Sequence, residues 1–96
     1  MADTVDDLSI NYEEDGKLIV KELKKEVLTK GAWATVMFLY QTLDKKTDIF
    51  GKKLISIRRY QKSDGQYRPK SKFNISSMEQ AKKICEIIHD WESDLE

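Results

Sequence analysis

The chain has 96 residues, 40% of them hydrophobic, and its 17 basic and 17 acidic side chains cancel. This length suits one domain with a modest core. The sequence has no membrane-spanning apolar run, and its acidic N-terminus lacks the basic and apolar regions of a signal peptide. One cysteine and one histidine exclude an internal disulfide and a usual zinc site. We expect an intracellular, cytoplasmic protein (nucleoid-associated if bacterial, nuclear if eukaryotic) without metal or other cofactor.

The zero net charge conceals an uneven distribution. Residues 1–16 carry six acidic side chains and no basic ones, and residues 84–96 carry five acidic and no basic ones. All 17 basic side chains lie within residues 17–83, and the excess is densest over residues 45–72, where ten Lys and Arg accompany two Asp. Such an excess favours a polyanionic partner over a merely solvated surface.

The N-terminal part has few structural signals. Residues 1–8 are acidic and aperiodic, which predicts a disordered tail before a single domain over residues 9–96. The dipeptide Asp15-Gly16 signals a turn. The β-branched start of Lys17–Leu28 favours a strand, although its lysines and glutamates have helical propensity. The sequence leaves open whether residues 9–28 form one strand or a hairpin.

Three more strands are predicted from alternation and turn residues. Residues 33–43 are apolar on both faces, which indicates a central strand. Residues 54–61 and 67–76 flank Asp64-Gly65, a second hairpin signal. Pro69 lacks a backbone donor, which predicts an edge position for the last strand.

Strict alternation along residues 67–76 predicts a division of its side chains between two faces. Tyr67 and Phe73 then share one face, and we interpret Phe73 as a core residue. Tyr60, on the preceding strand, is interpreted as shared between core and surface. The opposite face of the last strand then carries three cations, namely Arg68, Lys70 and Lys72.

One helix is predicted at the C-terminus. Ser76 with Glu79, or Ser77 with Gln80, would form a capping box at its start. Strands followed by one helix predict an antiparallel sheet with the helix on one face. The apolar stripe of the helix is wider than one sheet contact needs, so it either serves the small core entirely or also packs on a second subunit. The residues expected at such a dimer interface are Ile84, Ile87, Ile88 and Trp91.

The residue pattern argues against an enzyme. His89 stands alone in an acidic helix, and Cys85 lies on the apolar stripe, where it is interpreted as a core residue. Scattered glycines form no phosphate-binding loop. Cations interleaved with aromatic residues on strands instead indicate nucleic-acid binding, in which cations contact phosphates and aromatic rings stack on bases. Single strands are favoured over duplex because the sequence offers no recognition helix.

Residues 50–91 resemble the single-stranded-DNA-binding domain of the transcriptional coactivator called positive cofactor four. The resemblance is carried by Phe50-Gly-Lys-Lys-Leu-Ile-Ser-Ile-Arg-Arg-Tyr, by the turn at Gly65, by Tyr67-Arg-Pro-Lys-Ser-Lys and by the helix start from Ser77 to Gln80. The resemblance implies a curved four-stranded antiparallel sheet followed by a helix, a homodimer formed through the helices and no catalytic activity or cofactor. It also implies single-stranded DNA binding along the sheet by Phe50, Lys52, Lys53, Arg58, Arg68 and Lys72, to which the strand faces add Tyr60 and Lys70.

We therefore predict an α+β domain with a four- to five-stranded antiparallel curved sheet and one C-terminal helix that dimerises. The predicted function is non-enzymatic binding of single-stranded nucleic acid, DNA favoured over RNA, with little sequence preference and a coactivator-like or DNA-maintenance role. One alternative is a protein-interaction module whose basic sheet docks an acidic partner, and another is an RNA-specific binder. The acidic ends are hypothesised to compete with nucleic acid for the basic sheet.

Overall fold

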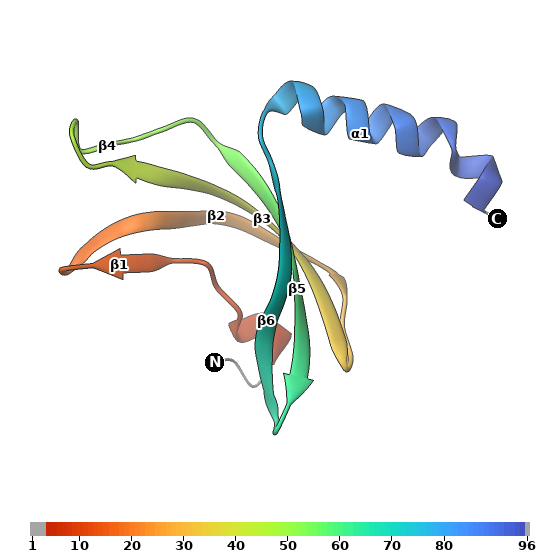
Figure 1. Cartoon of the computed structure of the whole chain (residues 1–96), viewed down its shortest axis with the longest axis horizontal. Coiled ribbons are helices and arrows are strands. Elements are labelled where there is room, and N and C mark those ends of the chain that lie inside the picture. The colour runs from red at the N-terminus through yellow and green to blue at the C-terminus, as the bar shows by residue number, and fades with distance from the viewer. Residues whose placement is uncertain (1–3, 96) are drawn as a thin grey trace.

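The computed structural model describes residues 4–95 and shows a curled antiparallel sheet followed by one helix (Figure 1). The strand order is β1-β2-β3-β5-β6, and β4 pairs with the end of β3. The predicted α+β class and antiparallel sheet are confirmed. In chain order the elements are η1 (Val5–Asp7), β1 (Tyr12–Glu14), β2 (Lys17–Thr29), β3 (Trp33–Asp44), β4 (Ile49–Phe50), β5 (Leu54–Ser63), β6 (Gln66–Ile75), α1 (Met78–Asp90) and η2 (Glu92–Leu95).

Two Asp-Gly turns set the hairpins. At Asp15-Gly16 the φ angles are 54° and 77°, and at Asp64-Gly65 they are 53° and 78°. A two-residue turn of this kind needs positive φ at both positions, which Asp tolerates and Gly adopts without strain. The first turn joins β1 to β2, with Glu14 opposite Lys17. Residues 9–28 therefore contain a short hairpin rather than one strand.

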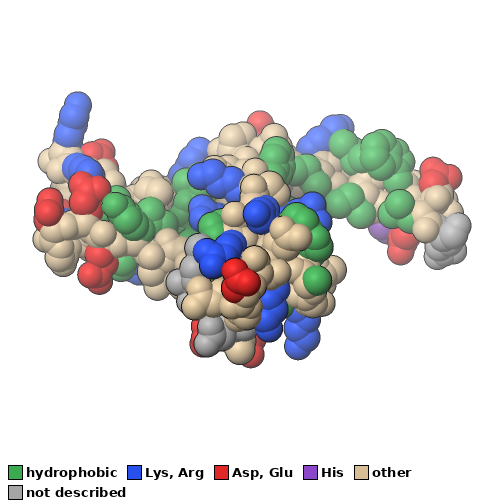
Figure 2. All heavy atoms as spheres, turned by 60° about the horizontal axis from the view of Figure 1, so that its bottom comes forward, with side chains coloured by type: hydrophobic (Ala, Val, Ile, Leu, Met, Phe, Trp, Pro, Cys, Tyr) green, Lys and Arg blue, Asp and Glu red, His purple; other side chains and the backbone are tan. Residues whose placement is uncertain are grey.

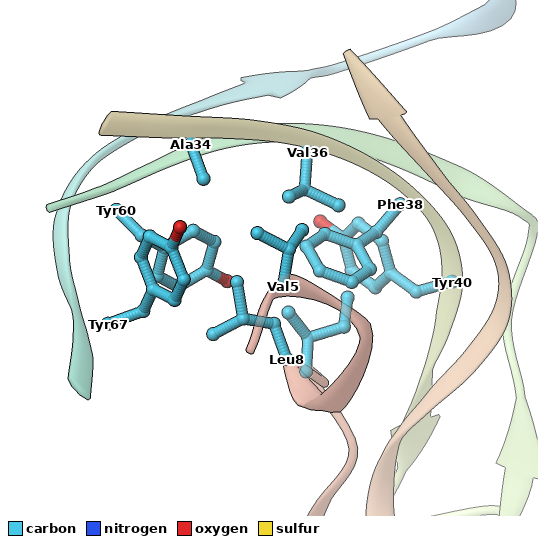
Figure 3. Packing of buried hydrophobic residues seen from close by; sticks show 9 residues of the cluster. Val5, Leu8, Ala34, Val36, Phe38, Tyr40, Tyr60 and Tyr67 are labelled. Carbon is cyan, nitrogen blue, oxygen red and sulfur yellow. The ribbon is translucent and has the colours of Figure 1, made fainter. Parts of the chain in front are cut away.

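The core lies on one face of the curled sheet, here called the inner face. Alternate residues of β3 are buried there, and Tyr60 of β5 lies directly opposite Ala34 in the ladder. Val36 and Phe38 are fully buried at 0% exposure, and Tyr67 of β6 is 5% exposed. The side chains of the inner face converge on the N-terminal segment (Figure 3). Both faces of β3 contribute apolar residues, in agreement with its predicted central position.

Residues 4–11 form a strap across the inner face. Val5 and Leu8 are each 7% exposed, and Figure 3 shows them between the tyrosines of β5 and β6 on one side and Phe38 on the other. The Lys25 Nζ atom donates hydrogen bonds to the carbonyl oxygens of Val5 at 2.7 Å, Asp6 at 2.9 Å and Leu8 at 2.7 Å. These hydrogen bonds give the carbonyl oxygens of the turn a donor at the boundary of the core, where an unpaired carbonyl group is costly.

The expected disordered tail over residues 1–8 is therefore wrong for residues 4–8, while residues 1–3 lie outside the described residues. The missed signal is short. Val5 and Leu8 are three positions apart, so one turn of 3₁₀ helix places both on the same side, and both then pack on the inner face. Their burial offsets the conformational entropy that the segment loses when it becomes ordered. The acidic composition had suggested that too little apolar surface would be buried to do so.

A β-bulge in the β5–β6 ladder changes which side chains share a face. Arg59 pairs with Ser71, but the next residue, Tyr60, pairs with Pro69, so Lys70 has no partner in the ladder. An extra residue reverses the alternation beyond it. Tyr67 therefore lies on the inner face, whereas Phe73 lies on the opposite, outer face and is 51% exposed. The prediction that Tyr67 and Phe73 share a face, and that Phe73 is a core residue, is wrong.

Helix α1 begins at the predicted cap. The Gln80 backbone N donates to the Ser77 Oγ atom at 3.1 Å, and the Ser76 backbone N donates to the Gln80 Oε1 atom at 2.8 Å. The helix then extends away from the sheet and packs mainly on β6, burying only Ala81 (Figure 1). It does not cover a sheet face as expected. Within residues 4–95 no helix is long and apolar enough to cross a membrane.

The outward course of the helix leaves its apolar stripe open. Ile84 and Ile87 are half-buried, and Ile88 and Trp91 are 55% and 60% exposed. Cys85, interpreted from sequence as a core residue, is exposed. The stripe therefore does not serve the core of this chain.

Candidate nucleic-acid interface

A basic groove lies at the open edge of the sheet. Arg58 of β5 and Lys72 of β6 are directly opposite each other in the ladder. Together with Lys70 they line a cavity of about 320 Å³, whose remaining walls are Pro69 and Ser71. The structure therefore brings three of the predicted binding residues to one place, on the strand that Pro69 correctly marked as an edge.

The Arg58 side chain is held by a short polar relay. The Arg58 Nε atom donates to the Ser56 Oγ atom at 3.2 Å, and the Ser56 hydroxyl donates to the Asn74 Oδ1 atom at 2.7 Å. Ser56 is fully buried, so its hydroxyl has no competing water. The relay holds the arginine at its Nε atom, and a planar guanidinium can bind an anion through two parallel hydrogen bonds. Sequence reasoning missed Ser56 and Asn74 because only the β5–β6 register places them side by side.

The groove has no internal counter-ion among the described residues. Across residues 4–95, the three ion pairs within 4.0 Å involve Lys17, Lys45 and His89, and none involves Arg58, Lys70 or Lys72. Figure 2 shows Lys and Arg side chains gathered over the forward end of the sheet, away from the projecting helix. Uncompensated cations on neighbouring strands produce a local positive potential that attracts a phosphate backbone.

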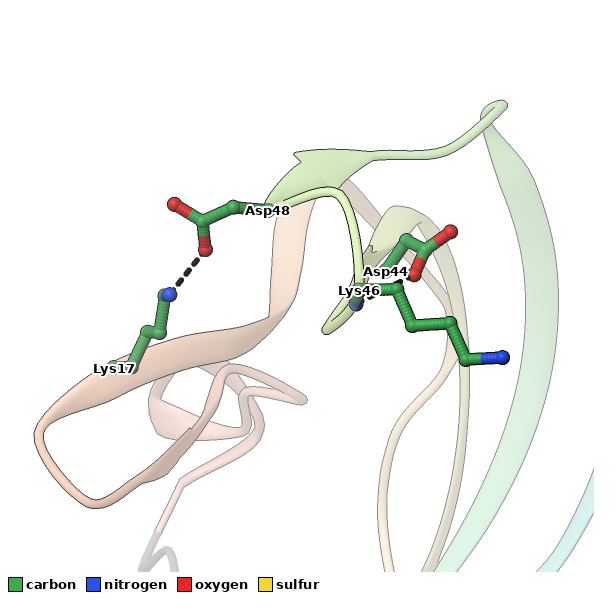
Figure 4. Close-up of polar contacts among 4 residues, drawn as sticks. All are labelled: Lys17, Asp44, Lys46 and Asp48. Atoms are coloured by element: carbon green, nitrogen blue, oxygen red, sulfur yellow. Dashed lines mark hydrogen bonds and ion pairs between the residues drawn. The ribbon is translucent and has the colours of Figure 1, made fainter.

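Two lysines at the opposite end of the sheet are paired with carboxylates. Lys17 pairs with Asp48 (Figure 4), and the Lys45 Nζ atom lies 2.8 Å from the Glu14 Oε1 atom. The hydrogen bond to Glu14, with its carboxylate charge, raises the pKa of Lys45 above its ordinary value. These pairs join the β1–β2 turn to the β3–β4 turn. The two carboxylates neutralise lysines that a count along the sequence includes in the basic excess.

The remaining predicted binding residues lie elsewhere. Phe50 is half-buried beside β3, with the Lys21 ammonium 5.1 Å from its ring centroid. Lys52 and Lys53 are exposed in the loop before β5, five to six residues from Arg58, which is about 16–20 Å along an extended chain. Arg68 lies across from Gln61, beyond the bulge from Lys72. The structure does not bring these four residues into the groove.

The aromatic residues differ from the stacking platform that the sequence suggested. Tyr60 is 5% exposed and presents no ring face to a base, and its burial raises the pKa of its phenol. Exposed rings lie instead on the outer face. Phe73 is 51% exposed, and Trp33 is 40% exposed with the Arg59 guanidinium 4.4 Å from its ring centroid. Any base stacking by β5 and β6 would therefore use the outer face and its edge.

His89 and Cys85 are both exposed on α1. His89 is a surface helix residue, as predicted, with its Nδ1 atom 3.6 Å from the Glu92 carboxylate. Within the described part of the chain, no three His, Cys, Asp or Glu side chains cluster as metal ligands.

No protein family, curated protein or solved structure matches this chain.

Proposed function

We propose that this protein binds single-stranded nucleic acid, without catalysis or a cofactor, through the groove lined by Arg58, Lys70 and Lys72. The observation that carries the proposal is this cluster of three cations on the edge of a sheet, which have no carboxylate partner within residues 4–95. Ions of this kind contact phosphates, which carry no sequence information, so we infer little sequence preference. The open edge suits one strand better than a duplex, whose major groove is read by helices or ribbons that protrude.

The resemblance of residues 50–91 to the positive cofactor four family adds to this proposal. The preference for DNA over RNA, and a coactivator-like or DNA-maintenance role, rest on that resemblance. An intracellular location follows from the proposed ligand. Arg58 and Lys72 are common to the resemblance and the groove, which makes them the two residues on which the proposal most depends.

We also propose that the protein is a homodimer formed through α1. Ile88 and Trp91 expose more than half of their surface, and the radius of gyration of 15.4 Å exceeds the roughly 12 Å of a compact chain of this length. A second copy that covers the stripe would remove this apolar surface from water. Light scattering should give twice the monomer mass for the wild type and a monomer for Trp91→Glu; a monomeric wild type would contradict the dimer.

Fluorescence anisotropy with labelled oligonucleotides tests the function. We expect single-stranded DNA to bind at low salt, with affinity that falls steeply as salt rises, and single-stranded RNA and duplex to bind more weakly. An acidic polypeptide of equal charge serves as competitor. Preference for that polypeptide over every oligonucleotide would establish a protein-interaction module instead, and preference for RNA would establish an RNA-specific binder.

A further inference from the structure

A second cavity, of about 380 Å³, lies where the strap meets two turns of the sheet. One wall is the strap from Thr4 to Asp6. A second wall is the β2–β3 turn at Lys30 and Gly31, and the third is the end of the β5–β6 hairpin at Lys62 and Tyr67. Sequence reasoning assigned no role to this combination, because the strap was expected to be disordered.

The walls of this cavity are fixed by hydrogen bonds. The Tyr67 hydroxyl donates to the Gly31 carbonyl oxygen at 2.6 Å, and the Lys62 backbone N donates to the Ala32 carbonyl oxygen at 2.8 Å. The three hydrogen bonds from Lys25 hold the strap in place. A preformed site loses less conformational entropy on binding than a flexible surface does.

The lining favours an anion over a nucleobase. Lys30 and Lys62 both reach the cavity, and across residues 4–95 neither ammonium has a carboxylate within 4.0 Å. Tyr67 is 5% exposed, and the Lys62 ammonium lies 5.5 Å from its ring centroid, so the ring is covered and cannot stack on a base. Among the described residues, Asp6 is the one acidic residue in the lining. Two cations and one carboxylate leave a positive site.

The cavity and the basic groove each take one cation from strand β5. Lys62 and Arg58 lie four residues apart on β5, so their side chains project from the same face about 13 Å apart. Tyr60 lies between them on the same face, with its ring buried in the cluster that includes Val5 and Leu8 of the strap. At the 3.4 Å rise of a stacked strand, about four nucleotides cover this span.

We propose that the cavity is a second phosphate-binding subsite, in which Lys30 and Lys62 hold a backbone phosphate of a single strand whose neighbouring phosphates occupy the Arg58–Lys72 groove. This inference rests on the proposed function. It adds a path to that function, because the strand runs along the β5–β6 hairpin toward its turn. It also adds a minimum length, because only a strand that spans both sites contacts all the cations. Asp6 weakens the subsite by repelling the phosphate.

Oligonucleotide length separates the subsite from the groove. We would measure anisotropy over a salt series with oligothymidylates of about 2 nucleotides, which are shorter than the span between the two sites, and of about 16 nucleotides, the upper end of the usual range for single-strand-binding sites. For the longer strand, Lys30→Ala with Lys62→Ala should make the slope of log K against log salt shallower by about 0.7, the value for the one phosphate that the two lysines hold. For the shorter strand, the slope should not change. Lys46→Ala with Lys82→Ala, which removes the same charge from exposed positions outside the cavity, should change neither slope.

Equal effects of the Lys30 and Lys62 substitutions on both strands, or no effect on either, would overturn the subsite while binding by the wild type preserves the proposed function. Failure of the wild type to bind either strand would overturn both the subsite and the proposed function.

A second pair of variants removes one negative charge from adjacent residues. Asp6→Asn should tighten binding of the longer strand several-fold, whereas Asp7→Asn, which lies outside the cavity, should not; equal effects would show a general charge effect and contradict the subsite.

Discussion

Two regions of the sheet carry similar densities of lysine and arginine but differ in what surrounds those side chains. At the β1–β2 and β3–β4 turns, here called the paired tips, Lys17 and Lys45 contact carboxylates from the neighbouring turn. At the β5–β6 hairpin, here called the open hairpin, Arg58 and Lys72 face each other with no carboxylate partner among the described residues. Charge along a sequence therefore does not measure charge available to a ligand. The pairing of strands decides which cations remain uncompensated.

The strap bears on this comparison because it supports the inner face below the open hairpin. Leu8 is 7% exposed, so Leu8→Ala should lower the free energy of unfolding by about 3 kcal/mol through lost burial and a residual cavity. Urea denaturation measures this change. Leu28→Ala, at a position 51% exposed, should cost less than half as much. Equal costs would mean that the strap is not part of the core.

The same observation revises the role of the acidic N-terminus. The strap reaches the sheet through Val5, Leu8 and backbone carbonyls, while the side chains of Asp6 and Asp7 are exposed. Removing residues 1–16 would therefore remove core residues together with negative charge. The single substitution Asp6→Asn tests charge competition without that loss.

Removing the partners of the paired tips would sharpen the comparison. Glu14→Gln with Asp48→Asn leaves Lys45 and Lys17 without carboxylates and raises the net charge by two. We expect the affinity for single-stranded DNA to rise by less than about threefold at 0.15 M salt, since the Debye length there is about 8 Å and the groove lies at the other end of the sheet. These exposed pairs should contribute little to the free energy of unfolding. An increase in affinity of tenfold or more would show that total charge, not the groove, determines binding.

The smallest effect concerns pH. Burial raises the pKa of Tyr60 above its ordinary value of 10.0, with partial compensation by Arg58. A raised pKa in the folded state means that the stabilisation is complete below pH 10.0 and is lost as pH rises through the folded-state pKa. Tyr60→Phe should therefore show a shallower loss of thermal stability above that pH than the wild type. Identical alkaline profiles would contradict the burial of Tyr60 as the cause.

Much of the fold follows from local sequence. The Asp-Gly turns, the alternation of β3 and the Ser77 cap predicted the strands and the start of α1. Two features depend on long-range packing and were mispredicted. The bulge at Lys70 places Tyr67 and Phe73 on opposite faces of the sheet, although Pro69 was a signal of irregularity. The strap forms only because the inner face offers it a place to bury Val5 and Leu8.

The candidate site was predicted in part for the same reason. Arg58 and Lys72 were predicted from the resemblance and Lys70 from the faces of the strands, and the three come together in the groove. Lys30 and Lys62 were missed because they lie far apart in sequence and meet only where two turns adjoin the strap. Phe50, Lys52 and Lys53 were predicted by resemblance and lie at the other end of β5, so their contribution to binding remains a prediction.

The comparison between the open hairpin and the paired tips is tested most directly by one salt titration of single-stranded DNA binding with two double variants. Arg58→Ala with Lys72→Ala should make the slope of log K against log salt shallower by about 1.4 and weaken binding about 25-fold at 0.1 M salt, if each cation neutralises one phosphate. Lys17→Ala with Lys45→Ala removes the same charge from the paired tips and should change affinity less than about threefold. Equal losses in the two variants, or an unchanged slope after removal of Arg58 and Lys72, would contradict this account.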